Sequence, residues 1–409
     1  MDIREKILQE ITRRNGVLNL KPCWVHRTLL PPGKRLKLNP DDLYRAGAER
    51  GGVCERWLSS TGMADNGALT LENEGLSFVV LKDGEELVAL KDAIDAAGDE
   101  ILGADVMNAF GCLQSFAKFY DFQAPIPFHV HLLEQDAQKV GAHSKPEAYY
   151  FPRQLNAIDY HSSYTYFGLL PGTTKEDIVD CISHWGRFGD NGIVEHSTAY
   201  KLKLGTGWNI PAGILHAPGS FVTYEPQRVS DTSSFWQSMV HDKFMERELM
   251  TKFYSDDKKE DYSYIADSID WEANLDPDFK KNHYHEPVPV KPVEKMEEAG
   301  YREEWVVYGS RDFSAKQLTV LPGRSVVIRD AAAYGFIMME GYGTINGMNI
   351  ETPAMIGYDD LTADEMYVCV DAAKKGVEIK NFSSRSPLVM LKHFGPSNPE
   401  AEKFIENTV

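Results

Sequence analysis

Cysteine is scarce in this chain of 409 residues, which contains only five. The five are far apart and odd in number, and no two form a Cys-x-x-Cys pair. This pattern argues against a disulfide framework of the kind that holds small secreted domains together. We therefore expect free thiols in a reducing compartment. The cysteines are Cys23, Cys54, Cys112, Cys181 and Cys369.

Long apolar runs are also absent. No stretch approaches the ~18 consecutive apolar residues that a membrane-spanning helix needs. The chain begins MDIREKILQEITRRNG, where Ile3, Ile7 and Ile11 alternate with charged residues. That spacing predicts an amphipathic helix that ends near Gly16, and it is not typical of a signal peptide. We therefore expect a cytoplasmic protein.

Basic residues are fewer than acidic ones. The chain has 43 Lys and Arg residues and 61 Asp and Glu residues, which gives a formal net charge of −18. A strong acidic balance argues against nucleic acid and anionic membrane surfaces as partners. It leaves room for a local basic pocket that would bind an anionic small molecule. A hydrophobic content of 43% is ordinary, so the chain has enough apolar residues to bury a core.

Length and turn signals predict two β domains. A chain of 409 residues is too long for one ordinary hydrophobic core. Short alternating segments rich in β-branched and aromatic residues occur on both sides of a polar stretch that ends in EPVPVKP. Many short strands of this kind favour a sandwich or barrel. The predicted division is an N-terminal helix and arm over 1–60, a first β domain over 61–235, a helical crossover and linker over 236–292, and a second β domain over 293–409.

A few segments have helical periodicity. Residues 89–120 and 234–254 are helical by period and composition. Residues 173–185, TTKEDIVDCISHW, are expected to form a further helix with Thr173 or Thr174 as its N-cap. The polar residues that lead to EPVPVKP are predicted to be a crossover that contains more helix.

One stretch of the first β domain contains two histidines one residue apart and a later glutamate. Side chains at positions i and i+2 of a strand point to the same face, so His129 and His131 can reach one ion. Glu147, in the next strand-like segment, can supply a third ligand. A fourth follows in residues 205–220, GTGWNIPAGILHAPGS, where Pro and Gly shape a tight turn before His216. The alternative is that the first two histidines are surface residues on an edge strand.

This His-x-His pair, the downstream acid and the later G-x5-P-x-G-x2-H resemble the two-part signature of the cupin barrel. The resemblance implies a mainly β bicupin of two jelly-roll barrels, with an added helical segment and an N-terminal helix. It implies that His129, His131, Glu147 and His216 point into the first barrel, while the second binds no metal. Three neutral imidazoles and one carboxylate suit one divalent transition ion, with Zn as the first expectation and Mn, Fe, Ni or Co as alternatives.

The sequence around this motif is similar to the class I phosphomannose isomerase family. The matching positions are Glu55-x-Trp57, Lys118, Pro125, His129-x-His131, Lys145-Pro146-Glu147, the run from Ile210 to Ala217, Glu225 and Ser230-Asp231. Together they span roughly residues 55–231, whereas the C-terminal half resembles the family's second, metal-free cupin only in pattern. The resemblance implies a metal-dependent aldose–ketose isomerase that acts on a sugar or sugar phosphate.

The sequence departs from that family's pattern at two points. The first ligand position holds His129, where the family usually has Gln. The Arg that the family has shortly after Ser230-Asp231 is missing, and Arg228 is our candidate for a compensating cation. Either change is compatible with a different substrate, for example a free sugar in place of its 6-phosphate.

The resemblance also implies roles for the residues around the ion. Aldose–ketose isomerisation moves a proton between C1 and C2 through a cis-enediol, which requires an electrophile at the oxygens and a base. Lys145 lies two positions from Glu147, so on a strand it shares that face and can bind a substrate oxygen or phosphate, or act as an acid. A surface lysine is the alternative. Glu225, Asp231 and Arg228 are the other catalytic candidates, to donate or accept protons or to orient their neighbours.

Three further residues are candidates for substrate binding. Lys118 is expected at the pocket, or else in a salt bridge. Trp57 can stack on a sugar ring, although a buried core tryptophan is the more frequent outcome. His143 can line the mouth of the site or lie in a solvated loop. The expected partner is a small-molecule sugar or sugar phosphate, with no nucleic acid and no membrane, and a homodimer is an allowed assembly.

The other histidines lack such a pattern. The sequence HYHE at 283–286 has no downstream Pro-Gly-His turn, so we do not expect a second metal site there. After residue 285 the chain has only His393, too few for a similar site in the second β domain. Four more are expected to be structural: His161, His184, His196 and His241.

Two other functions stay open. A ferrous site of three histidines and one glutamate with open positions could activate O2, as in a cupin dioxygenase or lyase. A non-catalytic, sugar-binding cupin with a structural ion is the second alternative. The Lys-Pro-Glu and E-x4-S-D patterns favour the isomerase, because an oxygenase has no evident need for them. The full ligand set with Lys145 beside it argues against the non-catalytic interpretation.

Overall fold

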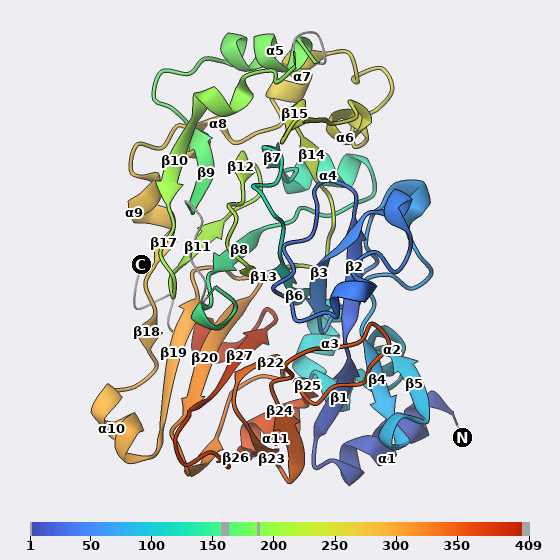
Figure 1. The fold of residues 1–409 in the computed structure, drawn as a ribbon, viewed down its shortest axis with the longest axis vertical. Coiled ribbons are helices and arrows are strands. Elements are labelled where there is room, and N and C mark those ends of the chain that lie inside the picture. Colours follow the sequence, from blue (N-terminus) through green and yellow to red (C-terminus); the bar gives the residue numbers. More distant parts are fainter. Residues whose placement is uncertain (1, 157–162, 186–188, 403–409) are drawn as a thin grey trace.

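The computed structural model describes residues 2–156, 163–185 and 189–402, and strands dominate it (Figure 1). The strands pair antiparallel throughout the five sheets of these residues. This confirms the predicted mainly β class, and the division into two barrels and the domain boundaries stay predictions. Among the described residues, no helix combines the length and the apolar character that crossing a membrane requires.

Two sheets in the upper half of Figure 1 hold the candidate site. In strand order, the seven-stranded sheet is β17 (Tyr284–His285), β11 (Gly207–Ile210), β8 (Glu147–Tyr150), β13 (Thr223–Arg228), β6 (Ser115–Tyr120), β3 (Gly52–Leu58) and β2 (Cys23–Arg27). The five-stranded sheet is β10 (Ser197–Lys201), β9 (Tyr164–Leu169), β12 (His216–Ala217), β7 (His129–Val130) and β14 (Ser234–Phe235). A separate hairpin is formed by β15 (Met239–Val240) and β16 (Lys243–Phe244).

The lower half contains a nine-stranded and a four-stranded sheet (Figure 1). The larger is β18 (Val288–Pro289), β19 (Tyr301–Val307), β20 (Ser314–Val320), β27 (Leu388–Phe394), β22 (Tyr334–Glu340), β25 (Glu365–Val368), β1 (Val17–Lys21), β4 (Phe78–Leu81) and β5 (Glu86–Ala89). The smaller is β21 (Ser325–Ile328), β26 (Val377–Asn381), β23 (Tyr342–Ile345) and β24 (Met348–Glu351). Strand β1, from the predicted N-terminal arm, therefore lies between strands from opposite ends of the chain.

Helices lie mainly at the two ends of the molecule (Figure 1). They are α1 (Ile3–Arg13), α2 (Leu90–Ile101), α3 (Ala104–Phe110), α4 (Glu134–Lys139), α5 (Lys175–Ser183), α6 (Glu248–Thr251), α7 (Tyr262–Ala266), α8 (Trp271–Asn274), α9 (Phe279–His283), α10 (Val293–Glu298) and α11 (Val370–Lys375). The predicted N-terminal helix is confirmed, and the chain turns at Gly16 with φ of 80°. The helix after residue 173 is also confirmed, with Thr174 in a capping box with Asp177.

Two helix predictions are wrong in part. Residues 89–120 contain α2 and α3 but end in strand β6, because Gly103 and Gly111, both with positive φ, interrupt the helix. Residues 234–254 form β14, β15, β16 and only the short α6. His241 and Asp242 both have positive φ, as a two-residue hairpin turn requires, and so they break the helical period.

Apolar packing and one buried ion pair join the two halves. Phe119 and Tyr224 of the seven-stranded sheet share a hydrophobic cluster with Val306 and Leu391 of the nine-stranded sheet. Beside it, Arg56 donates to both carboxylate oxygens of Asp364 at 2.8 Å, and both side chains are buried. These contacts hold the seven-stranded sheet, and with it one wall of the candidate site, against the lower half.

Candidate metal centre

Three buried histidines meet where β7 and β12 pair. His129 and His216 are direct cross-strand partners, and His131 follows two positions after His129 on the same face. One ring nitrogen from each lies within 4.8 Å of the others, and this is the group suited to a metal ion that the described residues contain. The cluster confirms that His129, His131 and His216 converge, and it excludes the alternative of histidines on an exposed edge.

The orientation of each ring is fixed by the backbone. Every Nδ1 lies within hydrogen-bond distance of a carbonyl oxygen, which can only accept, so Nδ1 carries the proton and Nε2 keeps its lone pair. The Nδ1···O pairs are His129 to Pro127 at 2.7 Å, His131 to Thr232 at 2.7 Å and His216 to Ile214 at 2.8 Å. This is the arrangement that orients imidazoles as metal ligands.

Glu147, the first residue of β8, lies beside the three rings. Its carboxylate oxygens are 3.0 Å from Nε2 of His131 and 3.2 Å from Nε2 of His216. Two lone pairs therefore face a carboxylate at close range, an unfavourable contact that a cation between them would turn into a favourable one. The donor set thus fits a divalent transition ion. The part of Glu147 as fourth ligand stays a prediction.

Burial favours the neutral form of two of the imidazoles, those of His129 and His131. It lowers the pKa of His131 to about 4, with the charge of Lys145 adding to the effect. Burial and the neighbouring imidazole of His216 lower the pKa of His129 as well. Burial alone would raise the pKa of Glu147, but neighbouring positive charge, chiefly that of Lys145, outweighs it and holds that pKa well below its usual value. The imidazoles of His129 and His131 and the carboxylate of Glu147 are therefore in the protonation states that bind a metal.

Lys145 shares the inner face with Glu147, as the spacing of two predicted. Its Nζ is 2.7 Å from Oε2 of Glu147, 3.2 Å from Oε1 of Glu225 and 3.3 Å from Nε2 of His131. The side chain is buried, which alone would lower its pKa, but the two carboxylates raise the pKa above its usual value. Lys145 is accordingly a cation inside the site and not a surface lysine.

Glu225 connects Lys145 to a second buried lysine. It lies on β13 directly opposite Lys118 of β6, and its Oε1 is 3.2 Å from Nζ of both lysines. Burial and the charge of Glu147 raise the pKa of Glu225 to about 7. The carboxylate therefore lies in an environment that moves its proton affinity towards neutral pH.

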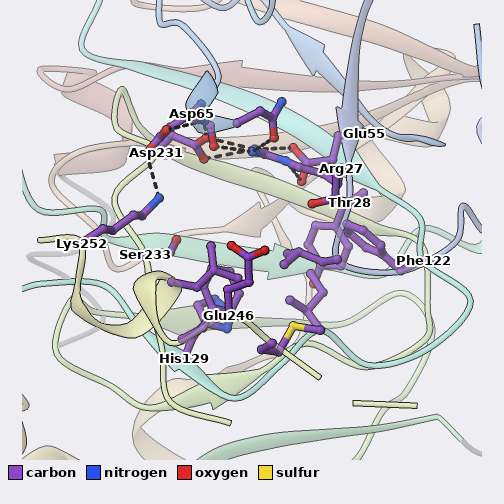
Figure 2. A pocket seen from close by; sticks show the side chains of 18 of the residues that line it. Arg27, Thr28, Glu55, Asp65, Phe122, His129, Asp231, Ser233, Glu246 and Lys252 are labelled. Carbon is purple, nitrogen blue, oxygen red and sulfur yellow. Dashed lines mark hydrogen bonds and ion pairs between the residues drawn. The ribbon is translucent and has the colours of Figure 1, made fainter. Parts of the chain in front are cut away.

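A cavity of about 590 Å³ opens onto these residues. Its size lies within the range of small-molecule sites in proteins. Figure 2 shows His129 on one side of it and the group of Arg27, Glu55 and Asp231 on the other. The predicted site residues that line it are Lys118, His129, Lys145, Glu147, Glu225 and Asp231.

The fully buried ligand candidates His131 and His216 lie outside this lining, and so do three further predicted residues. Arg228 donates to Glu134 at 2.9 Å, and His143 pairs with the same Glu134 at 3.0 Å through a side chain that is 62% exposed. Trp57 is a core residue whose Nε1 donates to Glu55 at 2.7 Å, so it presents no face to a sugar. The structure therefore does not bring Arg228, His143 and Trp57 to the cavity, because each is engaged elsewhere.

The sequence interpretation missed Arg27 and Tyr149. Arg27, on β2, pairs with Glu55 at 3.0 Å and with Asp231 at 3.0 Å. The cation beside Asp231 is therefore Arg27, whereas Arg228 had been predicted from the sequence. The hydroxyl of Tyr149 donates to Oε1 of Glu147 at 2.5 Å. Its spacing of two from Glu147 on a strand was a usable signal, whereas nothing in the sequence links Arg27 to a residue 204 positions away.

The two histidines of the HYHE segment contact neighbouring residues of the fold. Nδ1 of His283 lies 3.0 Å from the carbonyl of Asn209, and His285 stacks on Tyr308 with ring centroids 4.0 Å apart. The HYHE segment is thus engaged in packing. His161 lies outside the described residues. All five cysteines are free, which confirms that expectation.

Comparison with known proteins gives matches in structure alone. No family model matches the chain, and no curated protein sequence matches it. Among solved structures it is similar to the mannose 6-phosphate isomerase from Bacillus subtilis, with a TM-score of 0.61 and 15% identity over 93% of this chain and 99% of that one. A variant of the phosphomannose isomerase from Salmonella typhimurium matches with a TM-score of 0.60 and 14% identity, covering 93% and 100%. A mannose 6-phosphate isomerase bound with zinc and yttrium gives the same four values.

These matches extend over nearly the whole chain, including the half in which the sequence showed the family's pattern only weakly. At 14–15% identity they concern the fold and leave the activity open. The chain therefore has the cupin fold of the mannose 6-phosphate isomerases.

Proposed function

We propose that this protein is a metal-dependent isomerase that interconverts an aldose and a ketose. The observation that carries the proposal is the convergence of three Nε2 lone pairs, from His129, His131 and His216, beside the buried Lys145. His129 and Lys145 also line the cavity of about 590 Å³. The fold of the mannose 6-phosphate isomerases supports the same reaction class. The substrate is a sugar or sugar phosphate.

The three histidines and Glu147 would hold one divalent ion, and zinc is the first candidate because a structural neighbour is bound with zinc. Such an ion acts as a Lewis acid towards oxygens on which negative charge develops during isomerisation. The protein prepares for it by fixing every imidazole through Nδ1 and by excluding water from the buried rings.

Lys145 is proposed to bind and orient the open-chain sugar. Its ammonium has three donors, and its partners are Glu147, Glu225 and Nε2 of His131. Once that Nε2 holds the ion, the third donor would be available for a substrate oxygen. Because the neighbouring acids keep Lys145 protonated, it supplies positive charge where the sugar oxygen becomes negative.

Glu225 is proposed to move the proton between C1 and C2. It is a buried carboxylate that lines the cavity and lies next to Lys145. Its two lysine partners hold the carboxylate in place and compensate its charge as it takes up and returns a proton. Asp231 is proposed as a positioning residue that acts through Arg27.

The test is proton exchange in heavy water under anaerobic conditions. Purified protein loaded with zinc, and in parallel with manganese, would be incubated with mannose, fructose, lyxose and the 6-phosphates of the hexoses. Deuterium incorporation at C1 or C2 together with formation of the isomer supports the proposal. Absence of exchange with every sugar contradicts it, and turnover that requires O2 would favour an oxygenase instead.

A further inference from the structure

We infer that the cavity selects an uncharged sugar over its phosphate ester, an inference that rests on the proposed function and specifies its substrate class. A phosphate group carries about −1.5 to −2 charges at neutral pH and is normally bound by free arginines, lysines or backbone N–H groups. In this cavity the basic side chains already have partners, and acidic side chains outnumber them.

The basic side chains of the described cavity lining already have partners. Arg27 is bound by Glu55 and Asp231 at 3.0 Å each, and Lys252 by Asp65 at 2.8 Å. The deeper lysines, 118 and 145, are held by carboxylates at 3.2 and 2.7 Å, as described above. Nζ of Lys243, the remaining lysine, donates to the carbonyl of Thr28. A phosphate would therefore share each of these basic groups with a carboxylate or a carbonyl and would meet no free cation.

Acidic side chains outnumber the basic ones in the same lining. Eight of the described lining residues are acidic and five are basic, so a divalent ion would reduce the excess of three negative charges without reversing it. The acidic residues are Glu49, Glu55, Asp65, Glu147, Glu225, Asp231, Glu246 and Glu248. A phosphate in this cavity would therefore find no net positive charge to bind it.

The acids nearer the solvent are the ones that a phosphate at the far end of a sugar would meet. Glu246 is exposed and has no ion-pair partner among the described residues, and Figure 2 shows it between His129 and the Arg27 group. Glu248 has a lysine 3.6 Å away, at Lys259, which lies outside the lining. Both carboxylates can accept hydrogen bonds from sugar hydroxyls, which are donors that a phosphate ester lacks at that position.

The experiment compares free and phosphorylated sugars on one metal-loaded preparation. We expect kcat/KM for the preferred free aldose to exceed that for its 6-phosphate by about 100-fold or more. A preference for the 6-phosphate would overturn the inference and leave the proposed isomerase in place. If no sugar undergoes exchange, the proposed function fails. Calorimetric titration with the free sugar and with its 6-phosphate then tests the inference separately. Binding of the free sugar alone supports the inference, and any other result overturns it.

A charge variant tests the cause of the selectivity. In Glu246→Lys we expect the ratio of kcat/KM for the 6-phosphate to that for the free sugar to rise about 10-fold, because an acid at the cavity becomes a cation. Glu294→Lys is the matched control, since Glu294 is an exposed acid on α10 at the opposite end of the molecule (Figure 1). The same ratio in both variants would show that the cavity charge does not select the substrate.

Discussion

Arg27 and Asp231 lie 204 positions apart in the sequence, yet the guanidinium of Arg27 donates to both oxygens of Asp231, at 3.0 and 3.2 Å. The same guanidinium donates to both oxygens of Glu55. One buried cation therefore compensates two carboxylates on the cavity wall opposite His129 (Figure 2).

Removing this cation should destabilise the protein strongly. Arg27→Met leaves the buried Glu55 and the largely buried Asp231 without this partner. Removing one member of a buried ion pair typically costs about 3–5 kcal/mol of unfolding free energy. Urea denaturation followed by circular dichroism measures the loss. Arg302→Met is the control, because Arg302 and Glu297 form an exposed pair of the kind that contributes about 0–1 kcal/mol. Equal losses in the two variants would contradict a structural function for Arg27.

Lys145 should be required for turnover. We expect Lys145→Met to lower kcat by about 10²–10⁴-fold, the range typical of a group that assists proton transfer or binds a developing charge. Lys145→Arg should keep the positive charge and recover part of kcat. Lys139→Met, which removes an exposed lysine of α4, should leave kcat unchanged. A Lys145→Met enzyme with normal kcat would remove this residue from the mechanism.

Tyr149 should control metal affinity through Glu147. Its hydroxyl donates to Oε1 of Glu147, and loss of such a contact to a metal-binding carboxylate typically reduces affinity by about 10–100-fold. Competition with a chromophoric chelator would compare Tyr149→Phe with the wild type. Tyr150→Phe is a close control, because the neighbouring hydroxyl bonds to Gln317 on the other face of β8. If both variants bind the metal equally well, Glu147 does not depend on Tyr149.

His393 should make the fold sensitive to acid. Burial lowers its pKa to about 3, so between about pH 6.5 and pH 3 the unfolded chain binds a proton that the folded chain does not. Its contribution to stability is therefore complete above pH 6.5 and falls as the pH decreases towards 3. His393→Gln should flatten the pH dependence by up to about 1.4 kcal/mol per pH unit within that window.

The control for this effect is His184→Gln, since His184 is partly exposed and bonds to a backbone carbonyl of its own helix. Unfolding free energies of both variants and the wild type would be measured from pH 7 to pH 4. A slope for His393→Gln that matches the wild type would show that the buried imidazole of His393 is protonated in the folded protein.

The sequence predicted those parts of the site that depend on short-range geometry. The period of two in a strand pairs His129 with His131 and Lys145 with Glu147, and one Pro-Gly turn points to His216. Arg27 could not be predicted, because its partners are fixed by strand pairing across the whole first half of the chain. Arg228 was assigned to the cavity by proximity in sequence, whereas its side chain points to Glu134.

The sequence predicted the fold class, but it did not predict which strands pair with each other. Period and turn signals identified most strands, while the helical composition of residues 234–254 was overridden by the pairing of β14 with β7 and by the turn at His241 and Asp242. No local signal placed β1 between β25 and β4, because strand pairing between the chain ends is a property of the complete core.

The most direct test of the metal-centred account measures bound metal and proton exchange in parallel for the wild type, His216→Ala and the control His184→Ala. His216 is fully buried with Nε2 directed at the metal site, whereas His184 is outside it. We predict about one divalent ion per chain and C2 proton exchange in the wild type and in His184→Ala, with both lost in His216→Ala and in chelator-treated wild type. Exchange at the wild-type rate in His216→Ala, or in protein free of metal, would contradict the account.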